Sequence, residues 1–167
     1  MLYRLYQPRD FPALYAIEEA CFQPPLRFSR GYMRQLVGNP ETATWIAEQD
    51  GRMAGFAIVQ WLHDEDATVA YIQTIEVAAD KRRQGIAGEL LRSVEASARD
   101  AGAQAIWLHV DAKNSAALRL YERRGYAGQG REEHYYARDR AALVYCKKLA
   151  QSDPGATSPA NSPRSVF

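Results

Sequence analysis

A short basic segment, Asp80–Gly88, combines residue types that could bind an anion. It reads DKRRQGIAG and lies between a predicted strand that ends at Val77 and a predicted helix that begins near Gly85. The first turn of a helix has backbone N–H groups without intrahelical partners, and the helix dipole adds partial positive charge there. Gly85 and Ala87 are small enough to let a phosphate approach these groups closely. A phosphate is therefore the expected ligand, although a solvated loop before an ordinary helix has the same composition.

Two common nucleotide-binding motifs do not match this segment. It lacks the second spaced glycine followed by Lys-Ser/Thr that holds the phosphates of a nucleoside triphosphate, and it lacks the GxGxxG pattern of dinucleotide sites. A nucleoside triphosphate or NAD is therefore not favoured as the ligand.

The elements that must position this segment follow from the hydrophobic pattern. Alternating and continuous apolar runs predict strands, and apolar residues at helical spacing predict helices, with Asp10 and Ser29 as N-caps. The predicted strands span residues 2–6, 42–48, 53–62, 68–77, 105–110, a stretch from 126 onward, and 141–149. The predicted helices span residues 11–22, 29–38, 85–102 and 114–124.

The order of these elements predicts a mixed α/β sheet. The Asp-Gly turn at residues 50–51 predicts a β-hairpin, so the early strands are antiparallel. The helix over 85–102 connects two strands, and a connection of that length joins parallel strands with a right-handed crossover. The sheet is therefore antiparallel in its first half and parallel in the middle.

Composition limits the class of protein. The chain has 167 residues with 21 Lys and Arg against 20 Asp and Glu, so it lacks the basic excess of bulk nucleic-acid binding. Cys21 and Cys146 lie in no disulfide or metal motif. No apolar run approaches the roughly 20 residues that cross a bilayer. We expect a cytoplasmic protein that binds no metal, nucleic acid or membrane.

The chain divides near Ala150. Residues 1–150 have the hydrophobic content of one globular domain. Residues 151–167 are rich in Pro and Ser with little to bury, which predicts a disordered tail.

A second motif follows the predicted strand at 105–110. Asn114, Tyr121 and the pair Gly125-Tyr126 lie on and after the next helix, and the first motif has Arg82, Gly85 and Ala87 in the pattern RxxGxA. Both motifs, in this order, resemble the GCN5-related N-acetyltransferase (GNAT) superfamily. The resemblance implies a GNAT fold of seven strands and about four helices. It also implies that the two central parallel strands splay apart to admit acetyl-CoA.

The resemblance assigns residues to acetyl-CoA. The pyrophosphate would bind the loop before the central helix, and backbone groups of Ile75 and Val77 would bind the pantetheine arm and the acetyl carbonyl. The predicted cofactor-binding residues are Ile75, Val77, Arg82, Arg83, Gln84, Gly85, Ile86, Ala87, Gly88, Asn114, Ala117 and Tyr121.

Three segments of three or four residues resemble the corresponding segments of protein N-terminal acetyltransferases of the NatE catalytic-subunit and RimI types. These segments are Tyr71-Ile72-Gln73-Thr74, Leu108-His109-Val110 and His134-Tyr135-Tyr136. The resemblance implies that Phe22, Pro25, Leu26, Tyr71, Tyr135 and Tyr136 bind the substrate. Gln23 and Pro24 look like an insertion in the segment around the first substrate side chain.

The implied chemistry is direct attack of an amine on the thioester. A protein α-amino group has a pKa of about 7.7–8.0 against about 10.4 for lysine, so a weak base acting through water suffices. Tyr71 and His109 would order that water, the Val77 N–H would polarise the thioester oxygen, and Tyr121 would protonate the leaving thiolate.

Simpler roles remain open for these residues. His109 could be a structural hydrogen-bonding residue, Tyr121 a core residue and the tyrosine pair sheet packing. Strand alternation places Glu76 on the face opposite Tyr71, in a solvated or ion-paired setting, and Trp107 on the face of His109, where it would wall the site.

Alternatives to N-terminal acetylation also stay open. A small amine could be the acceptor, and the chain could be a coenzyme A-binding module without turnover. The sequence is compatible with a monomer or a dimer.

Overall fold

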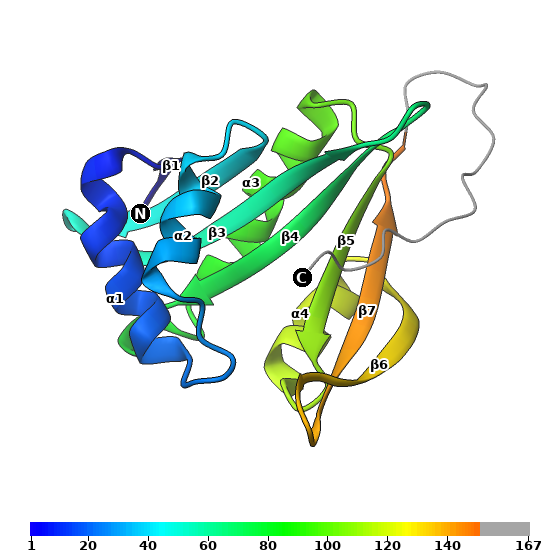
Figure 1. Ribbon diagram of the computed structural model, residues 1–167. Coiled ribbons are helices and arrows are strands. Elements are labelled where there is room, and N and C mark those ends of the chain that lie inside the picture. Colours follow the sequence, from blue (N-terminus) through cyan, green and yellow to red (C-terminus); the bar gives the residue numbers. More distant parts are fainter. Residues whose placement is uncertain (151–167) are drawn as a thin grey trace.

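The computed structural model describes residues 1–150, so the predicted tail lies outside the described residues. Figure 1 shows a single sheet with helices packed along it. The strands are β1 (Leu2–Leu5), β2 (Thr42–Gln49), β3 (Arg52–His63), β4 (Thr68–Val77), β5 (Ala105–Asp111), β6 (Ala127–Ala137) and β7 (Arg140–Lys148). The helices are α1 (Phe11–Cys21), α2 (Arg30–Gly38), α3 (Ile86–Asp100) and α4 (Ser115–Arg123), with short 3-10 turns at Pro8–Asp10 and Ala79–Lys81.

The sheet has seven strands in the order β1-β2-β3-β4-β5-β7-β6. All neighbouring pairs are antiparallel except β4 and β5, which are parallel and joined by the α3 crossover. The predicted mixed sheet, antiparallel in its first half and parallel in the centre, is confirmed.

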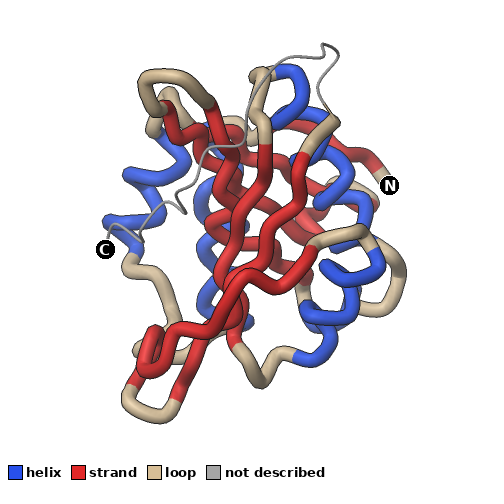
Figure 2. Tube along the Cα trace, turned by 90° about the vertical axis from the view of Figure 1, so that its right-hand side faces the viewer, coloured by secondary structure: helices blue, strands red, loops and turns tan. Residues whose placement is uncertain are grey.

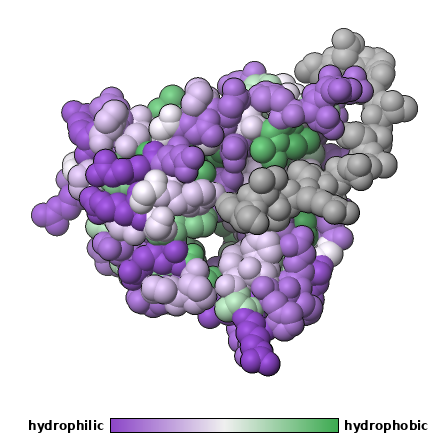
Figure 3. Space-filling view, viewed as in Figure 1, coloured by the Kyte–Doolittle hydropathy of each residue, from purple (hydrophilic) through white to green (hydrophobic). Residues whose placement is uncertain are grey.

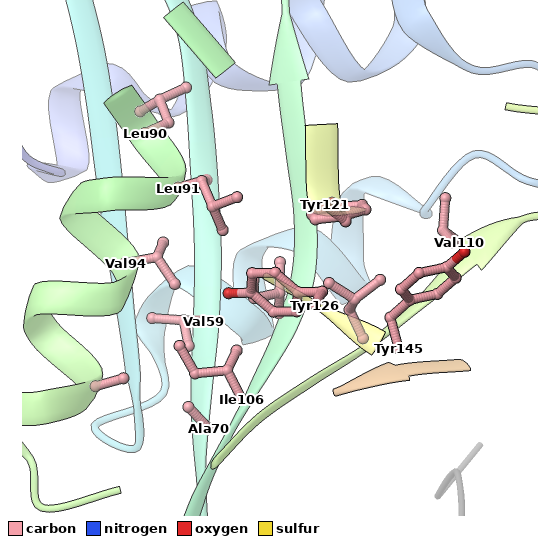
Figure 4. Close-up of a cluster of buried hydrophobic side chains, with 14 of the residues drawn as sticks. Val59, Ala70, Leu90, Leu91, Val94, Ile106, Val110, Tyr121, Tyr126 and Tyr145 are labelled. Carbon is pink, nitrogen blue, oxygen red and sulfur yellow. The ribbon is translucent and has the colours of Figure 1, made fainter. Parts of the chain in front are cut away.

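Helices cover both faces of this sheet (Figure 2). On one face, α3 and α4 pack on a core that includes Ile72, Leu90, Ile106 and Tyr121. Figure 4 shows part of this core, with Leu90, Leu91 and Val94 directed from α3 toward the sheet. On the other face, α1 and α2 pack on a second core. Its fully buried members include Leu14, Met33, Ile46, Phe56 and Ile58.

The two parallel strands separate along their length. Backbone pairing between β4 and β5 extends only from Ala70 to Ile72, opposite Ile106 to Leu108. Beyond this region the strands diverge, and β5 continues toward α4 while β4 stays with β3 (Figure 1). The predicted splay is confirmed, and it leaves residues 73–77 of β4 without a strand partner on the β5 side.

A β-bulge in β4 exchanges the faces of its side chains. Val59 of β3 pairs with Ile72 and the next pair is Ile58 with Thr74, so Gln73 is the extra residue. Ile72 before the bulge and Ile75 after it both pack on the α3 side of the sheet. Glu76 consequently faces α1, on the same face as Tyr71. The prediction that Glu76 lies opposite Tyr71 in a solvated or ion-paired setting was wrong, because alternation does not continue through a bulge.

The two predicted N-cap residues differ in what their side chains bind. Ser29 accepts a hydrogen bond from the Tyr32 N–H at 3.1 Å, as expected of an N-cap. Asp10 precedes α1 but forms no side-chain cap to it. Its carboxylate accepts instead from the Gln7 N–H at 2.7 Å and binds the Arg4 guanidinium. Asp10 is therefore the N-cap residue of α1, as predicted, but its side chain does not cap the helix, since the half-buried Arg4 offers a charged partner.

The hairpin of β6 and β7 is irregular. Glu132 pairs with Ala142 and Ala137 pairs with Arg140, so residues 133–136 of β6 lie opposite Ala141 alone. His134 has φ +55° within this stretch. This local expansion turns Tyr135 and Tyr136 toward the separation between β4 and β5.

Neither cysteine of the described chain is in a disulfide. Within residues 1–150, no helix is both long and apolar enough to cross a membrane.

Candidate active site

A cavity of about 550 Å³ opens where β4 and β5 separate. The face of the molecule in Figure 3 is mostly hydrophilic and is hollowed between its α1 side and its β5–β7 side. The cavity is lined by the end of α1 and the loop after it, β4, β5, α4 and β6.

The structure brings most of the predicted side chains to this cavity. Those that line it are Phe22, Pro25, Leu26, Tyr71, Ile75, His109, Asn114, Ala117, Tyr121, Tyr135 and Tyr136. Val77 and the whole of the predicted anion loop, residues 82–88, do not line it and lie where β4 ends and α3 begins. Trp107, predicted to wall the site, is also absent from the lining.

A chain of polar contacts crosses the cavity from β4 to β6. The Tyr71 hydroxyl lies 2.8 Å from Nδ1 of His109. On the other side of the same ring, Nε2 lies 3.2 Å from a carboxylate oxygen of Glu132. Tyr71 and His109, which were predicted to order a water molecule together, are therefore in direct contact. Glu132 was not predicted, because its strand shows no apolar alternation that would set its direction.

The Tyr71 phenol is held in its neutral form. Burial and the adjacent Tyr135 phenol raise the pKa of Tyr71 far above its usual value. A neutral phenol has one proton to donate and lone pairs to accept, so Tyr71 can both donate to His109 and accept from a substrate.

Tyr121 faces the cavity from α4. Its ring packs edge-on against Tyr126, with centroids 5.5 Å apart, and burial raises the pKa of Tyr121 above its usual value. The N-cap of this helix is Asn114, whose side-chain oxygen accepts from the Ala117 N–H at 3.1 Å. Asn114 therefore has a structural role as a helix cap. Because its pKa is raised, the Tyr121 hydroxyl keeps its proton at neutral pH and can donate it.

The backbone of β4 presents donors to the gap. The Ala78 N–H donates to the Ala54 carbonyl at 2.9 Å, in register with the pair Gly55 and Val77. Hydrogen bonding alternates along an antiparallel ladder. The N–H groups of Ile75 and Val77 therefore point away from β3, into the space between β4 and β5.

The anion loop has the geometry expected for a phosphate site. Gly85 precedes α3 with φ +80°, and no side chain caps the helix. Arg82 folds back on the end of β4, where its Nε donates to the Val77 carbonyl at 3.1 Å. Gly88 has a packing role in addition, because its carbonyl accepts from Arg124 at 2.8 Å and a Cβ there would lie 3.2 Å from that guanidinium.

Two buried carboxyl groups lie beside the cavity. Glu18 of α1 is fully buried and its Oε1 accepts from the Phe28 N–H at 2.7 Å, while Glu76 accepts from the Thr74 hydroxyl at 2.8 Å. Each has a second oxygen without another hydrogen-bond donor among the described residues. Burial and the neighbouring Glu18 carboxyl raise the pKa of Glu76 well above its usual value. The raised pKa favours the protonated, neutral form of Glu76 in this position.

The loop after α1 is anchored on both sides. The Glu18 carboxylate binds the Phe28 N–H, and the Tyr15 hydroxyl donates to the Phe28 carbonyl at 3.1 Å. Phe22, Pro25 and Leu26 lie in this loop and give the cavity an apolar wall.

No group of three His, Cys, Asp or Glu side chains within residues 1–150 is placed to hold a metal ion.

The features above define a group-transfer site. One end has the backbone donors and dipole that bind an anionic carrier, and the other has groups that move protons.

The chain belongs to the acetyltransferase (GNAT) family, whose sequence pattern matches residues 11–126. It is 32% identical over 127 residues to the ribosomal protein bS18 alanine N-acetyltransferase of Escherichia coli K12, covering 76% of this chain and 81% of that protein. It is 37% identical over 97 residues to the streptothricin acetyltransferase of Streptomyces lavendulae, covering 58% of this chain and 50% of that enzyme.

Solved structures agree with this assignment. The crystal structure of the Escherichia coli S18-alanine N-acetyltransferase has a TM-score of 0.81 and 25% identity, covering 94% of this chain and 99% of the other. Arabidopsis thaliana NAA60 in complex with acetyl-CoA has a TM-score of 0.78 at 22% identity, covering 89% and 98% of the two chains. The predicted family and fold are confirmed.

Proposed function

We propose that this protein transfers the acetyl group of acetyl-CoA to the α-amino group of a protein or peptide N-terminus. The observation that carries the proposal is the order of groups along the separation of β4 and β5. The uncapped start of α3 lies at the end of β4, the N–H groups of Ile75 and Val77 point away from β3 along this strand, and the Tyr71–His109 pair lies in the cavity beyond them. The similarity to a ribosomal-protein alanine N-acetyltransferase supports a protein N-terminus as the acceptor.

The residues fit acetyl-CoA in both charge and shape. The start of α3 supplies backbone donors beside Arg82 and Arg83, which suits a pyrophosphate. Gln84, Gly85, Ile86, Ala87 and Gly88 complete this segment. The N–H groups of Ile75 and Val77 would bind the pantetheine arm and the acetyl carbonyl, while Asn114 and Ala117 line the opposite wall. NAA60, which has the same fold, is known in complex with acetyl-CoA.

Three side chains handle the protons of the reaction. Tyr71 and His109 accept a proton from the amine, so that its lone pair can attack the thioester carbon directly. The C–S bond then breaks, and Tyr121 donates a proton to the thiolate that leaves. The pKa of an α-amine is about 2.5 units below that of lysine, so a weak base is sufficient.

Phe22, Pro25 and Leu26 would contact the first residue of the acceptor. Tyr135 and Tyr136 would bind its backbone from the β6 side. A cytoplasmic location and a monomeric or dimeric state stay predictions.

A small amine is the second candidate acceptor. The streptothricin acetyltransferase is a relative over 97 residues, although the chain spans half the length of that enzyme. An open cavity of about 550 Å³ accommodates either a small amine or the end of a peptide.

The decisive experiment compares acceptors under identical conditions. The protein is incubated with acetyl-CoA and peptides that have a free α-amine, the same peptides with a blocked α-amine and an internal lysine, or small amines that include streptothricin. Released thiol and product mass are measured. Acetylation of the free α-amine alone supports the proposal, and turnover of small amines alone contradicts it. Coenzyme binding without any turnover would instead identify a coenzyme A-binding module.

A further inference from the structure

We propose that Glu132 is a positioning residue that fixes the tautomer of His109, so that Nε2 carries the ring proton and Nδ1 accepts the proton of Tyr71. The inference deepens the proposed function and rests on it for its catalytic consequence. Its structural part concerns only the imidazole ring and is measurable without any substrate.

The surroundings of Nε2 favour a proton on that atom. The His109 side chain is 5% exposed, whereas that of Glu132 is 46% exposed, so the carboxylate reaches in from the cavity mouth. The Oε1 to Nε2 distance is 3.2 Å, which is close enough for electrostatic attraction but lacks the geometry of a hydrogen bond. Nε2 has no hydrogen-bond partner among the described residues. The dipole of an N–H beside a carboxylate is attracted to it, whereas a lone pair there is repelled.

The surroundings of Nδ1 favour a lone pair on that atom. Its partner at 2.8 Å is the Tyr71 hydroxyl. Burial keeps this phenol protonated, so it has an O–H to donate. Each ring nitrogen therefore meets the partner that the same tautomer requires.

The ring cannot turn freely away from these partners. Tyr135 stacks on it with ring planes 8° apart. Glu132 is held at its place on β6 by pairing with Ala142, immediately before the expanded stretch of the hairpin. The carboxylate and the stacked ring therefore come from the same strand and act on His109 together.

This tautomer makes a proton relay possible. A proton of the substrate ammonium moves to the Tyr71 oxygen while the original Tyr71 proton moves to Nδ1 of His109. The amine becomes neutral, Tyr71 is unchanged and His109 becomes an imidazolium that faces the Glu132 carboxylate. In the opposite tautomer Nδ1 already carries a proton, so the relay has no acceptor.

The test combines nitrogen NMR with kinetics. The full-length protein is labelled with ¹⁵N-histidine, and the ring signals of His109 are identified by their loss in His109→Gln. We expect the proton on Nε2 in the parent protein and a mixture of both tautomers in Glu132→Ala. Glu132→Asp should partly restore the parent tautomer. Glu133→Ala is the matched control, because Glu133 is the next residue on β6, 62% exposed and paired with Arg131.

For the acceptor that the protein turns over, kcat of Glu132→Ala should fall about 10- to 100-fold with little change in KM. Glu133→Ala should match the parent. The inference is overturned if His109 keeps its Nε2 proton in Glu132→Ala, or if both variants have the parent kcat. A tautomer shift in a protein that acetylates no amine would support the positioning role while contradicting the proposed function.

Discussion

The ring of Tyr135 stacks on the ring of His109, with centroids 4.5 Å apart and planes 8° apart. Tyr135 belongs to β6 and His109 to β5, and β7 lies between these strands in the sheet. The contact exists because residues 133–136 expand out of the β6–β7 ladder and reach across the cavity.

Removing this stacking should loosen the imidazole. Tyr135→Ala deletes the stacked ring, so we expect a 3- to 10-fold loss of kcat/KM, in line with the roughly 0.5–1.5 kcal/mol of an aromatic pair. Tyr135→Phe keeps the ring and separates stacking from the hydroxyl. Steady-state kinetics of both variants measure the difference. Equal losses in both would assign the effect to the hydroxyl instead.

Tyr71→Phe should interrupt proton transfer without removing the ring. In the proposed relay the proton passes from the substrate amine through the Tyr71 phenol, which contacts Nδ1 of His109, so we expect kcat to fall about 10²-fold or more. KM for acetyl-CoA should stay near the parent value, since the phosphate-binding segment is unaffected. Initial rates at saturating acceptor test this. A parent-like kcat would remove Tyr71 from the proton path.

Glu76→Gln should flatten the dependence of stability on pH. The pKa of Glu76 is raised in the folded protein, so the folded state holds a proton that the unfolded state releases above about pH 4.5. The stabilisation is complete below that pH and is lost as pH rises toward the folded pKa. Glutamine keeps the shape without the charge, so the variant should be more stable than the parent at pH 8, by about 1 kcal/mol or more.

Urea unfolding at pH 5 and pH 8 measures this effect. Glu19→Gln is the control, because Glu19 is exposed on α1 next to Glu18 and its replacement also removes one negative charge. If both variants change stability equally at each pH, the burial of Glu76 makes no contribution of its own to the pH dependence of stability.

Gly85→Ala should weaken coenzyme binding through the backbone. Gly85 has φ +80° with nothing within 4 Å of an added Cβ, so the cost is conformational strain of about 1–2 kcal/mol rather than a clash. We expect lower stability by that amount and weaker acetyl-CoA binding by calorimetry. Gly31→Ala in α2 is the matched control, since its site is also open and its φ is not positive. Unchanged affinity in Gly85→Ala would argue against the start of α3 as the pyrophosphate site.

Local pattern and spacing were sufficient for the element order, the crossover and the loop before α3. Periodicity places Ile86, Leu90 and Val94 on one side of a helix, and a crossover of that length makes β4 and β5 parallel whatever the other contacts are. The family pattern also pointed to Tyr71, His109 and Tyr121, and all three line one cavity in the structure, while their catalytic roles stay predictions.

Only the tertiary structure decided which face Glu76 occupies, that Glu18 is its partner, and that Glu132 reaches His109. The bulge at Gln73 and the expansion at residues 133–136 arise from register between strands, which depends on neighbours distant in sequence. Side-chain alternation is a local rule, so it holds along an unbroken strand and reverses where pairing inserts a residue. The sequence therefore indicates which side chains are candidates for the reaction, whereas strand pairing determines which side chains contact them.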